Sequence, residues 1–252
     1  MRDETGSVGT MGRRRRSSAA LALTGEFRLQ IGGVEVVLPH SVERLVAFLA
    51  LARRPVARSR VAGNLWSDAS EARSSGSLRS ALWRLRDVGW PVVRSLDRRL
   101  ELSPEVTVDA IELTAVMERL LGRPDRRNTR PVPEIASARE ILPDWDEADW
   151  LAIERVRYAR LRLEALEAAA KACLEIGDTV LAVEAALAAT EADPFRESAI
   201  RLLISAYTAE GNTSQAIQAY RGFRDLVHTE LGVDPSESLE AQIAKIQGLA
   251  TA

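Results

Sequence analysis

The stretch Ser74–Asp87 reads S-S-G-S-L-R-S-A-L-W-R-L-R-D. Its apolar residues recur at the spacing of one helix face: Leu78, Ala81, Leu82 and Leu85. The opposite face has no carboxylate and carries Ser77, Arg79, Ser80, Trp83, Arg84 and Arg86. A short helix with such a face fits the major groove of DNA, where arginine pairs with guanine or binds phosphate. A merely solvated basic face is the alternative, because such faces are common on helices.

Short strands are predicted before this helix, from Ala20 to the proline at position 39. The segment Phe27–Ile31 alternates apolar and polar residues, and Gly32-Gly33 is typical of a two-residue hairpin turn. The apolar run V-E-V-V-L follows that turn. The pattern predicts a small antiparallel sheet that ends at Pro39.

Two further helices are predicted between the sheet and Ser74. The first begins with Ser41 as N-cap and runs to about Arg53, where Pro55 ends it. Its buried residues are expected to be Val42, Leu45, Val46 and Leu49. The second covers roughly residues 58–66, and a polar turn over residues 67–72 leads to the arginine-rich helix.

A second hairpin is predicted after that helix, with its tip at Ser95–Arg98 and with Arg94, Arg98 and Arg99 near the tip. Strands, three helices and a hairpin follow one another in the order of a winged helix-turn-helix. In that fold the third helix enters the major groove, and the hairpin contacts the DNA backbone or the minor groove. The order therefore favours DNA binding over a solvated basic face.

The rest of the chain has helical periodicity. We expect a helix over Val106–Leu121, an exposed and mobile loop over Gly122–Pro133, and a long helix over Asp146–Ile176. A last helix is predicted over Ser236–Leu249.

An internal repeat lies in this helical region. The stretch C-L-E-I-G-D-T-V-L-A-V-E-A from Cys173 aligns with Y-T-A-E-G-N-T-S-Q-A-I-Q-A from Tyr207, an offset of 34 residues. This is the period of tetratricopeptide repeats, in which small residues let paired helices pack closely. The alignment pairs Gly177 with Gly211, Ala182 with Ala216 and Ala185 with Ala219.

Composition separates the chain into a basic and an acidic part. Residues 1–110 contain 18 arginines and 12 acidic residues, a net charge of +6, whereas residues 111–252 contain 16 basic and 24 acidic residues, a net charge of −8. The first part suits a polyanion, as expected of a nucleic-acid-binding module joined to a protein-interaction module. Residues 1–19 are predicted to be a disordered basic tail that includes the run Arg13–Arg16.

Catalytic and cofactor motifs are scarce. Cys173 is the single cysteine and is expected to be a small buried hydrophobic residue, while His40 and His228 are the two histidines. The two lysines, Lys171 and Lys245, do not lie in a phosphate-binding loop. We therefore expect that the protein binds no metal or cofactor and is not an enzyme. The chain also has no apolar run of the roughly 20 residues that a membrane span needs, and we interpret it as cytoplasmic.

With these features, the chain resembles the SARP-type transcriptional activators (Streptomyces antibiotic regulatory proteins) in their short form, which lacks a nucleotide-binding domain. V-A-G-N-L-W-S-D from Val61 and S-L-R-S-A-L-W-R-L-R from Ser77 resemble the family's OmpR/PhoB-type winged helix. Segments that resemble its bacterial transcriptional activation domain are L-P-D-W-D-E-A-D-W-L from Leu142, E-R-V-R-Y-A-R-L-R-L-E-A-L-E from Glu154, D-P-F-R-E from Asp193 and A-Y-R-G-F-R-D-L-V-H-T-E-L-G-V-D-P from Ala219.

The resemblance implies binding to double-stranded promoter DNA, commonly at direct repeats where two copies can act as a dimer, and activation through RNA polymerase holoenzyme. It divides the chain into the tail at 1–19, a winged helix-turn-helix DNA-binding domain at 20–107 and an all-α, tetratricopeptide-like bacterial transcriptional activation domain at 108–252. It implies a cytoplasmic, nucleoid-associated regulator of secondary metabolism. The expected DNA-binding residues are Ser77, Arg79, Ser80, Arg84, Arg86, Arg98 and Arg99.

The sequence departs from the family pattern at two positions. Trp83 stands where a small or polar residue is usual, and Ala57 replaces the usual serine or threonine cap of the second helix. Three other tryptophans, Trp66, Trp145 and Trp150, are expected to anchor the core or a domain interface. A second hypothesis also stays open. In it the repeat region is a protein-interaction scaffold or a ligand sensor, and the winged helix does not read DNA sequence.

Overall fold

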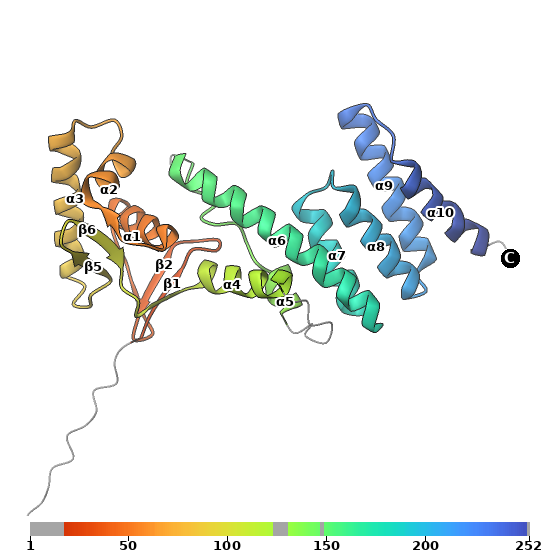
Figure 1. Cartoon of the computed structure of the whole chain (residues 1–252), viewed down its shortest axis with the longest axis horizontal. Helices are drawn as coiled ribbons and strands as arrows, with labels where there is room; N and C mark the ends of the chain where they lie inside the picture. Colours follow the sequence, from red (N-terminus) through yellow and green to blue (C-terminus); the bar gives the residue numbers. More distant parts are fainter. Residues whose placement is uncertain (1–17, 123–130, 147–148, 251–252) are drawn as a thin grey trace, which may run out of the picture.

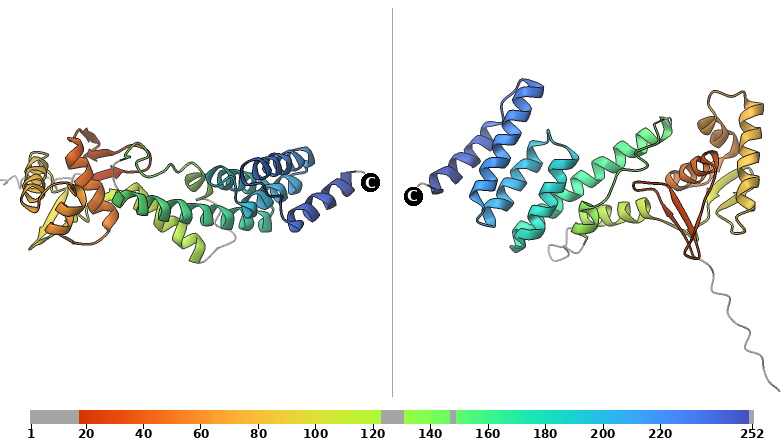
Figure 2. Two further views of the ribbon diagram at one scale, coloured as in Figure 1. Left: turned by 90° about the horizontal axis from the view of Figure 1, so that it is seen from above. Right: turned by 180° about the vertical axis from the view of Figure 1, so that it is seen from behind.

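The structure is a computed structural model that describes residues 18–122, 131–146 and 149–250. Figures 1 and 2 show the strands and the first helices at one end of an elongated molecule, with the later helices side by side in a row toward the other end. The fold is mainly helical with a small β content, as the sequence predicts. Most of the predicted tail and most of the predicted loop at 122–133 lie outside the described residues.

The first sheet has the strand order β3-β2-β1-β7. Its strands are β1 (Ala19–Ala22), β2 (Arg28–Ile31), β3 (Val34–Val36) and β7 (Val106–Val108). The predicted antiparallel pairing is confirmed, with Leu21 opposite Leu29, and both glycines of the β2–β3 turn have positive φ angles. β1 begins at Ala19, the last residue of the predicted tail, and Ala19 is fully buried.

Three helices that pack on one another follow β3 in the chain: α1 (His40–Ala52), α2 (Arg58–Leu65) and α3 (Glu71–Arg86). The predicted N-cap of α1 is wrong. Pro39 precedes the helix, and its carbonyl accepts hydrogen bonds from the backbone N–H groups of Val42 and Glu43, so Ser41 already lies inside the first turn. Val42, Leu45, Val46 and Leu49 are buried as predicted.

The arginine-rich helix α3 is one turn longer than predicted. The N–H of Ser74 donates to the carbonyl of Ser70 at 2.9 Å, which closes a first turn that the sequence assigned to a polar connection. Leu78, Ala81 and Leu85 are buried and Leu82 is half-buried, so the predicted apolar face is confirmed.

The predicted hairpin after α3 is present in the second sheet, whose order is β4-β6-β5. β5 (Val93–Leu96) and β6 (Arg99–Leu102) form the antiparallel hairpin, called the wing below, and β4 (Val56–Ala57) pairs with the other edge of β6. Asp97 at the tip has φ +52°, a left-handed conformation that aspartate tolerates in tight turns.

The predicted helix from Val106 is wrong at its start. Residues Val106–Val108 instead form β7, which runs parallel to β1, and α4 begins at Asp109 and ends at Gly122. The Asp109 carboxylate accepts hydrogen bonds from the backbone N–H groups of Leu23 (2.8 Å) and Thr24 (3.1 Å), from the Thr24 hydroxyl and from the N–H of Ala110. This single side chain joins the end of β1 to the start of α4.

The helical region begins with α5 (Val132–Ala136) and α6 (Asp149–Ile176). The segment before α6 pairs with the end of β1: the N–H of Leu142 donates to the carbonyl of Leu23 at 2.9 Å, and the N–H of Gly25 donates to the carbonyl of Glu140 at 2.7 Å. Buried residues of the winged-helix part and the helical region form one continuous hydrophobic cluster.

Two of the three predicted tryptophan anchors, Trp145 and Trp150, lie at this junction, while Trp66 at the end of α2 is half-buried against the hydrophobic cluster. The Trp145 ring stacks on Phe27 with ring centroids 5.9 Å apart, and it meets His40 edge-on at 4.8 Å. The Trp150 ring meets Phe48 edge-on at 5.2 Å. These contacts join the first sheet and α1 to the segment that leads into α6.

The remaining helices are α7 (Thr179–Ala192), α8 (Glu197–Ala209), α9 (Thr213–Leu231) and α10 (Glu237–Ala250). Residues that are paired in the alignment of the predicted repeat have the same structural role in both copies. Gly177 and Gly211 end their helices with positive φ angles of 78° and 86°. Ala182, Ala185 and Ala216 are fully buried between helices, and Ala219 is half-buried.

Hydrogen bonds at the two turns also match. The N–H of Asp178 donates to the carbonyl of Cys173 at 2.9 Å, and the N–H of Asn212 donates to the carbonyl of Tyr207 at 2.8 Å. This bond closes a Schellman motif at the C-terminus of each first helix of a pair. The sequence repeat is therefore a repeat of structure.

Within the described residues, no helix has the length and apolar character that crossing a bilayer requires. The same residues contain no group of histidine, cysteine, aspartate and glutamate side chains that could hold a metal ion.

Asp109→Ala tests the junction between β1 and α4. Removing a carboxylate that several donors share leaves partly buried N–H groups unpaired, so we expect a loss of about 2 kcal/mol in the free energy of unfolding. Chemical denaturation followed by circular dichroism measures this value. Asp87→Ala, at an exposed position after α3, is the matched control and should change stability little. Equal stability of both variants would contradict the role of Asp109.

The Cys173 thiol tests the packing of α6 against α7. It is fully buried, and burial raises the pKa of Cys173 to about 11. Because the thiolate is the reactive form, the thiol should react roughly 100-fold more slowly with a disulfide reagent at pH 8 in the native protein than in denaturant. The rate of thionitrobenzoate release measures this. Reaction at equal rates would show that α6 and α7 separate readily.

Candidate nucleic-acid interface

The outward face of α3 is the basic surface that the sequence predicts. Arg79, Ser80, Arg84 and Arg86 are exposed on it, together with Trp83, whose exposed fraction is 63%. Buried Leu78, Ala81 and Leu85 fix the opposite face against the core, so the orientation of the basic face follows from packing.

These arginines have no carboxylate partner in the part of the chain that the structure describes. Ion pairs in that part involve other arginines, such as Arg94 with Glu101 at 3.8 Å in the wing. A guanidinium without a partner keeps its donors available for an anion, and its planar fork matches the two oxygens of a phosphate or the O6 and N7 atoms of guanine.

A shallow hollow of about 630 Å³ lies on this surface. It is lined by Arg58, Arg79, Ser80, Leu82, Trp83, Arg84 and Arg86. Sequence reasoning missed Arg58, because it lies at the start of α2 and reaches α3 only through tertiary structure. The sequence does hold a signal for it, because Arg58 directly follows Ala57, the position where the usual helix cap is missing.

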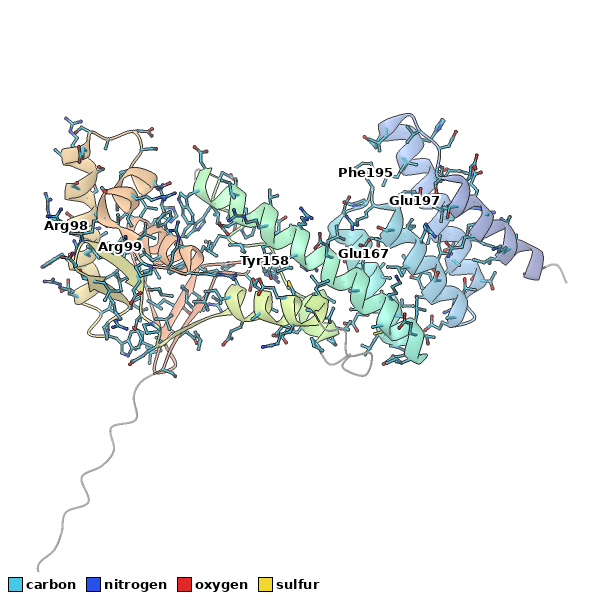
Figure 3. All side chains as sticks on the ribbon, in the orientation of Figure 1. Arg98, Arg99, Tyr158, Glu167, Phe195 and Glu197 are labelled. Carbon is cyan, nitrogen blue, oxygen red and sulfur yellow. The ribbon has the colours of Figure 1, made fainter. Side chains whose placement is uncertain are left out.

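The wing lies next to α3, and Figure 3 labels its two exposed arginines, Arg98 and Arg99. Arg58 holds the wing in place: its N–H donates to the carbonyl of Arg98 at 3.0 Å, and its guanidinium donates to the Ser95 hydroxyl at 3.0 Å. Arg98 and Arg99 do not line the hollow, so the predicted residues form two neighbouring groups, one on α3 and one on the wing.

The two predicted serines differ. Ser77 is half-buried and does not line the hollow, whereas Ser80 is exposed on it. The Ser80 hydroxyl donates to the carbonyl of Gly76 at 3.2 Å, which leaves the oxygen lone pairs free to accept. Ser80 is therefore the better placed of the two to meet a ligand on this face.

The motifs of the helical region hold helices together. The Arg196 guanidinium donates two hydrogen bonds of 2.8 Å to the Glu167 carboxylate, which also accepts from the Ser198 hydroxyl. Burial alone would raise the pKa of Glu167, but the hydrogen bonds from Arg196 and Ser198 lower it. Glu197 accepts hydrogen bonds from the N–H and hydroxyl of Ser236. The D-P-F-R-E segment thus ties α8 to α6 and to the start of α10.

Each of the two histidines lies beside one carboxylate near the end of a helix. His40 Nδ1 lies 3.2 Å from a Glu43 carboxylate oxygen, and His228 Nδ1 lies 3.5 Å from an Asp234 carboxylate oxygen on α9 and the turn after it. Both pairs are exposed side-chain contacts at the ends of helices, typical of surface residues.

Comparison with known proteins agrees with this architecture. Residues 139–247 match the family described as bacterial transcriptional activator domain. Regulatory protein AfsR of Streptomyces coelicolor is 27% identical over 213 residues, which covers 80% of this chain and 21% of AfsR. Regulatory protein AfsR of Streptomyces griseus is 26% identical over 228 residues, with 82% and 22% covered. The chain spans about a fifth of the length of these relatives.

A solved structure shares the fold. Mycobacterium tuberculosis EmbR, in complex with a low-affinity phosphopeptide, has a TM-score of 0.71 and 22% sequence identity, and the match covers 92% of this chain and 66% of the EmbR chain. The match extends over both the winged helix and the helical region, so the predicted fold class is confirmed. Over residues 139–247 the chain thus resembles bacterial transcriptional activators, and over about four fifths of its length it is similar to the AfsR regulatory proteins.

Proposed function

We propose that this protein activates transcription by binding promoter DNA in a sequence-specific way and by recruiting RNA polymerase holoenzyme. The DNA-binding part is residues 20–107, and the activation part is residues 108–252. The observation that carries the proposal is the face of α3, on which exposed arginines that have no carboxylate partner among the described residues lie beside the arginines of the wing.

In this proposal α3 enters the major groove. Arg79, Arg84 and Arg86 are suited to guanine or phosphate, and Ser80 can accept from or donate to a base edge. Trp83 departs from the usual small residue, and its exposed ring is suited to apolar contact with thymine methyl groups. Ser77 is half-buried and is the weakest member of the set.

The wing supplies the second group of contacts. Arg98 and Arg99 lie next to α3, and Arg58 connects the wing to α2, so the three guanidiniums can follow the DNA backbone beside the groove that α3 occupies. Contacts with phosphate position the protein without reading the sequence. The protein thus combines sequence reading by α3 with positioning by the wing.

The activation step rests on the match of residues 139–247 to the bacterial transcriptional activator domain. Residues 111–252 carry a net charge of −8, which disfavours DNA and leaves the helical repeats available for contact with a protein. We assign RNA polymerase holoenzyme as that partner, with two copies of the regulator bound to direct repeats in the promoter. The site of action is the nucleoid in the cytoplasm.

The variant Arg84→Ala/Arg86→Ala tests the role of α3. Loss of two guanidiniums that contact bases should weaken binding to the promoter by at least ~30-fold, since each good arginine–guanine pair contributes about 1–3 kcal/mol. Fluorescence anisotropy with DNA fragments from around the protein's own gene measures the affinity, and circular dichroism verifies the fold.

Arg119→Ala/Arg201→Ala is the matched control, because it removes two exposed arginines from α4 and α8 and changes the net charge equally. Its affinity should stay close to that of the unchanged protein. Unchanged affinity in the α3 variant would exclude α3 as the reading helix. Absence of salt-sensitive DNA binding in the unchanged protein would favour a protein-interaction scaffold instead.

The variant Arg98→Ala/Arg99→Ala tests the wing separately. Lost phosphate contacts should weaken binding by a similar factor on every fragment and lower the slope of log K against log salt by roughly 2, about one for each contact. Titrations at several salt concentrations give this slope. A loss confined to one promoter sequence would mean that the wing reads bases.

A further inference from the structure

Trp83 is a large apolar side chain that the core of this protein does not use. The other four tryptophans pack against the hydrophobic cluster: Trp66, Trp90, Trp145 and Trp150. Trp83 has an exposed fraction of 63%, and no ring contact joins it to another aromatic side chain in the described part of the chain. An exposed indole ring is unfavourable in water, and tryptophan is enriched where proteins bind a partner. The position of Trp83 therefore suits contact with a ligand.

Trp83 lies in the middle of the outward face of α3. Ala72 and Gly76 precede it by about three and two helical turns, so the three residues lie in one line along the helix. Ala72 and Gly76 are small, and a methyl group added to Gly76 would have Nη2 of Arg79 as its nearest neighbour, at 3.8 Å. The line thus carries one large apolar group, and that group is the indole ring of Trp83.

The hollow on this face places the ring among basic groups. Its lining contains two apolar residues, Leu82 and Trp83, beside one serine and four arginines. The guanidiniums and the hydroxyl suit phosphates and the polar atoms of base edges. The electron-rich face of an indole ring does not suit a phosphate, so the ring requires an apolar group on the same ligand. In the major groove of DNA, the apolar group of the base edges is the 5-methyl group of thymine.

We propose that Trp83 determines specificity by recognising the 5-methyl group of a pyrimidine in the promoter. 5-Methylcytosine carries its methyl group at the same ring atom as thymine. The protein therefore prefers thymine to uracil, and 5-methylcytosine to cytosine, at the base that faces Trp83. Methylation of cytosine at this base then changes the affinity for the promoter. This inference rests on the proposed function, because it requires α3 to lie in the major groove.

Replacement of thymine by uracil tests the inference, because it removes the methyl group and keeps every hydrogen-bonding atom of the base. Fragments from around the protein's own gene, amplified with thymidine or with deoxyuridine triphosphate, are the two probes. We expect the unchanged protein to bind the uracil fragment about fourfold more weakly, the effect of one methyl group that is no longer buried. Trp83→Ser should bind both fragments with similar affinity. Fluorescence anisotropy measures the affinities, and circular dichroism verifies the fold.

Two control variants separate the methyl contact from a general loss of affinity. Trp83→Phe keeps an apolar ring and should keep most of the preference for the thymine fragment. Arg98→Ala/Arg99→Ala should weaken binding to both fragments by the same factor, because the contacts that it loses are to phosphate. The ratio of the two affinities should therefore stay that of the unchanged protein.

Cytosine methylation provides a second readout. Single uracil substitutions locate the thymine that Trp83 contacts, and this T·A pair is then replaced by C·G with or without a 5-methyl group on the cytosine. The methylated site should bind the unchanged protein about fourfold more tightly than the unmethylated site. Trp83→Ser should bind the two sites with similar affinity.

Equal affinity of the unchanged protein for the thymine and uracil fragments would overturn the inference. The proposed function would stand as long as binding is selective among fragments and sensitive to salt. A uracil effect of the same size in Trp83→Ser would also overturn the inference, because another side chain or the shape of the DNA would then be responsible. Equal affinity for the methylated and unmethylated cytosine sites would overturn recognition of the methyl group. Absence of selective DNA binding would overturn the proposed function itself, and this inference with it.

Discussion

The Arg155 guanidinium holds the turn through which the winged helix and the helical region are joined. It donates hydrogen bonds to the backbone carbonyls of Ile141, Leu142 and Trp145, with Nε 2.8 Å from the first oxygen and Nη2 3.3 Å from the last. One planar guanidinium can donate hydrogen bonds to several carbonyls of a turn, where no helix or strand supplies donors for them. Leu142 has φ +46° in this turn, which is uncommon for leucine and requires such support.

The turn faces both parts of the molecule, so its shape sets how they meet. The Leu142 N–H extends the pairing at the end of β1, Trp145 packs on Phe27, and Trp150 follows at the start of α6. The motifs L-P-D-W and E-R-V-R-Y therefore have one physical explanation: the first supplies the carbonyls and aromatic ring of the junction, and the second supplies the arginine that fixes them. The helices that follow stack on α6, so their placement also depends on this junction.

The sequence predicted best what short-range patterns determine. Alternation and paired glycines defined the β2–β3 hairpin, and the offset between Gly177 and Gly211 defined a repeat because the same cap is needed at both turns. The prediction of a helix at Val106–Val108 was wrong. These residues pair with β1, a strand far away in sequence, and this pairing outweighs the helical periodicity that continues into α4. The sequence pattern also misplaced the start of α1, because the Pro39 carbonyl accepts the first hydrogen bonds, a role the hydroxyl of Ser41 does not take.

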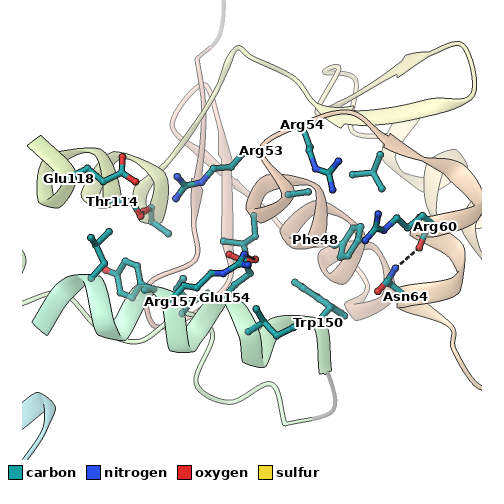
Figure 4. A pocket seen from close by; sticks show the side chains of 18 residues that line it. Phe48, Arg53, Arg54, Arg60, Asn64, Thr114, Glu118, Trp150, Glu154 and Arg157 are labelled. Carbon is teal, nitrogen blue, oxygen red and sulfur yellow. Dashed lines mark hydrogen bonds and ion pairs between the residues drawn. The ribbon is translucent and has the colours of Figure 1, made fainter. Parts of the chain in front are cut away.

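The same distinction applies to the surfaces of the molecule. The basic face of α3 belongs to one helix, so spacing alone placed Arg79, Arg84 and Arg86 together, and only Arg58 required the fold. A cavity lined by residues of α1, β4, α2, α4 and α6 (Figure 4) is different, because no local pattern in the sequence connects these segments. In the sequence, Arg53 looks like an ordinary charge at the end of a helix. Its place among residues of α4 and α6 comes from the fold, in which the Arg155 turn helps to hold α6 against α1.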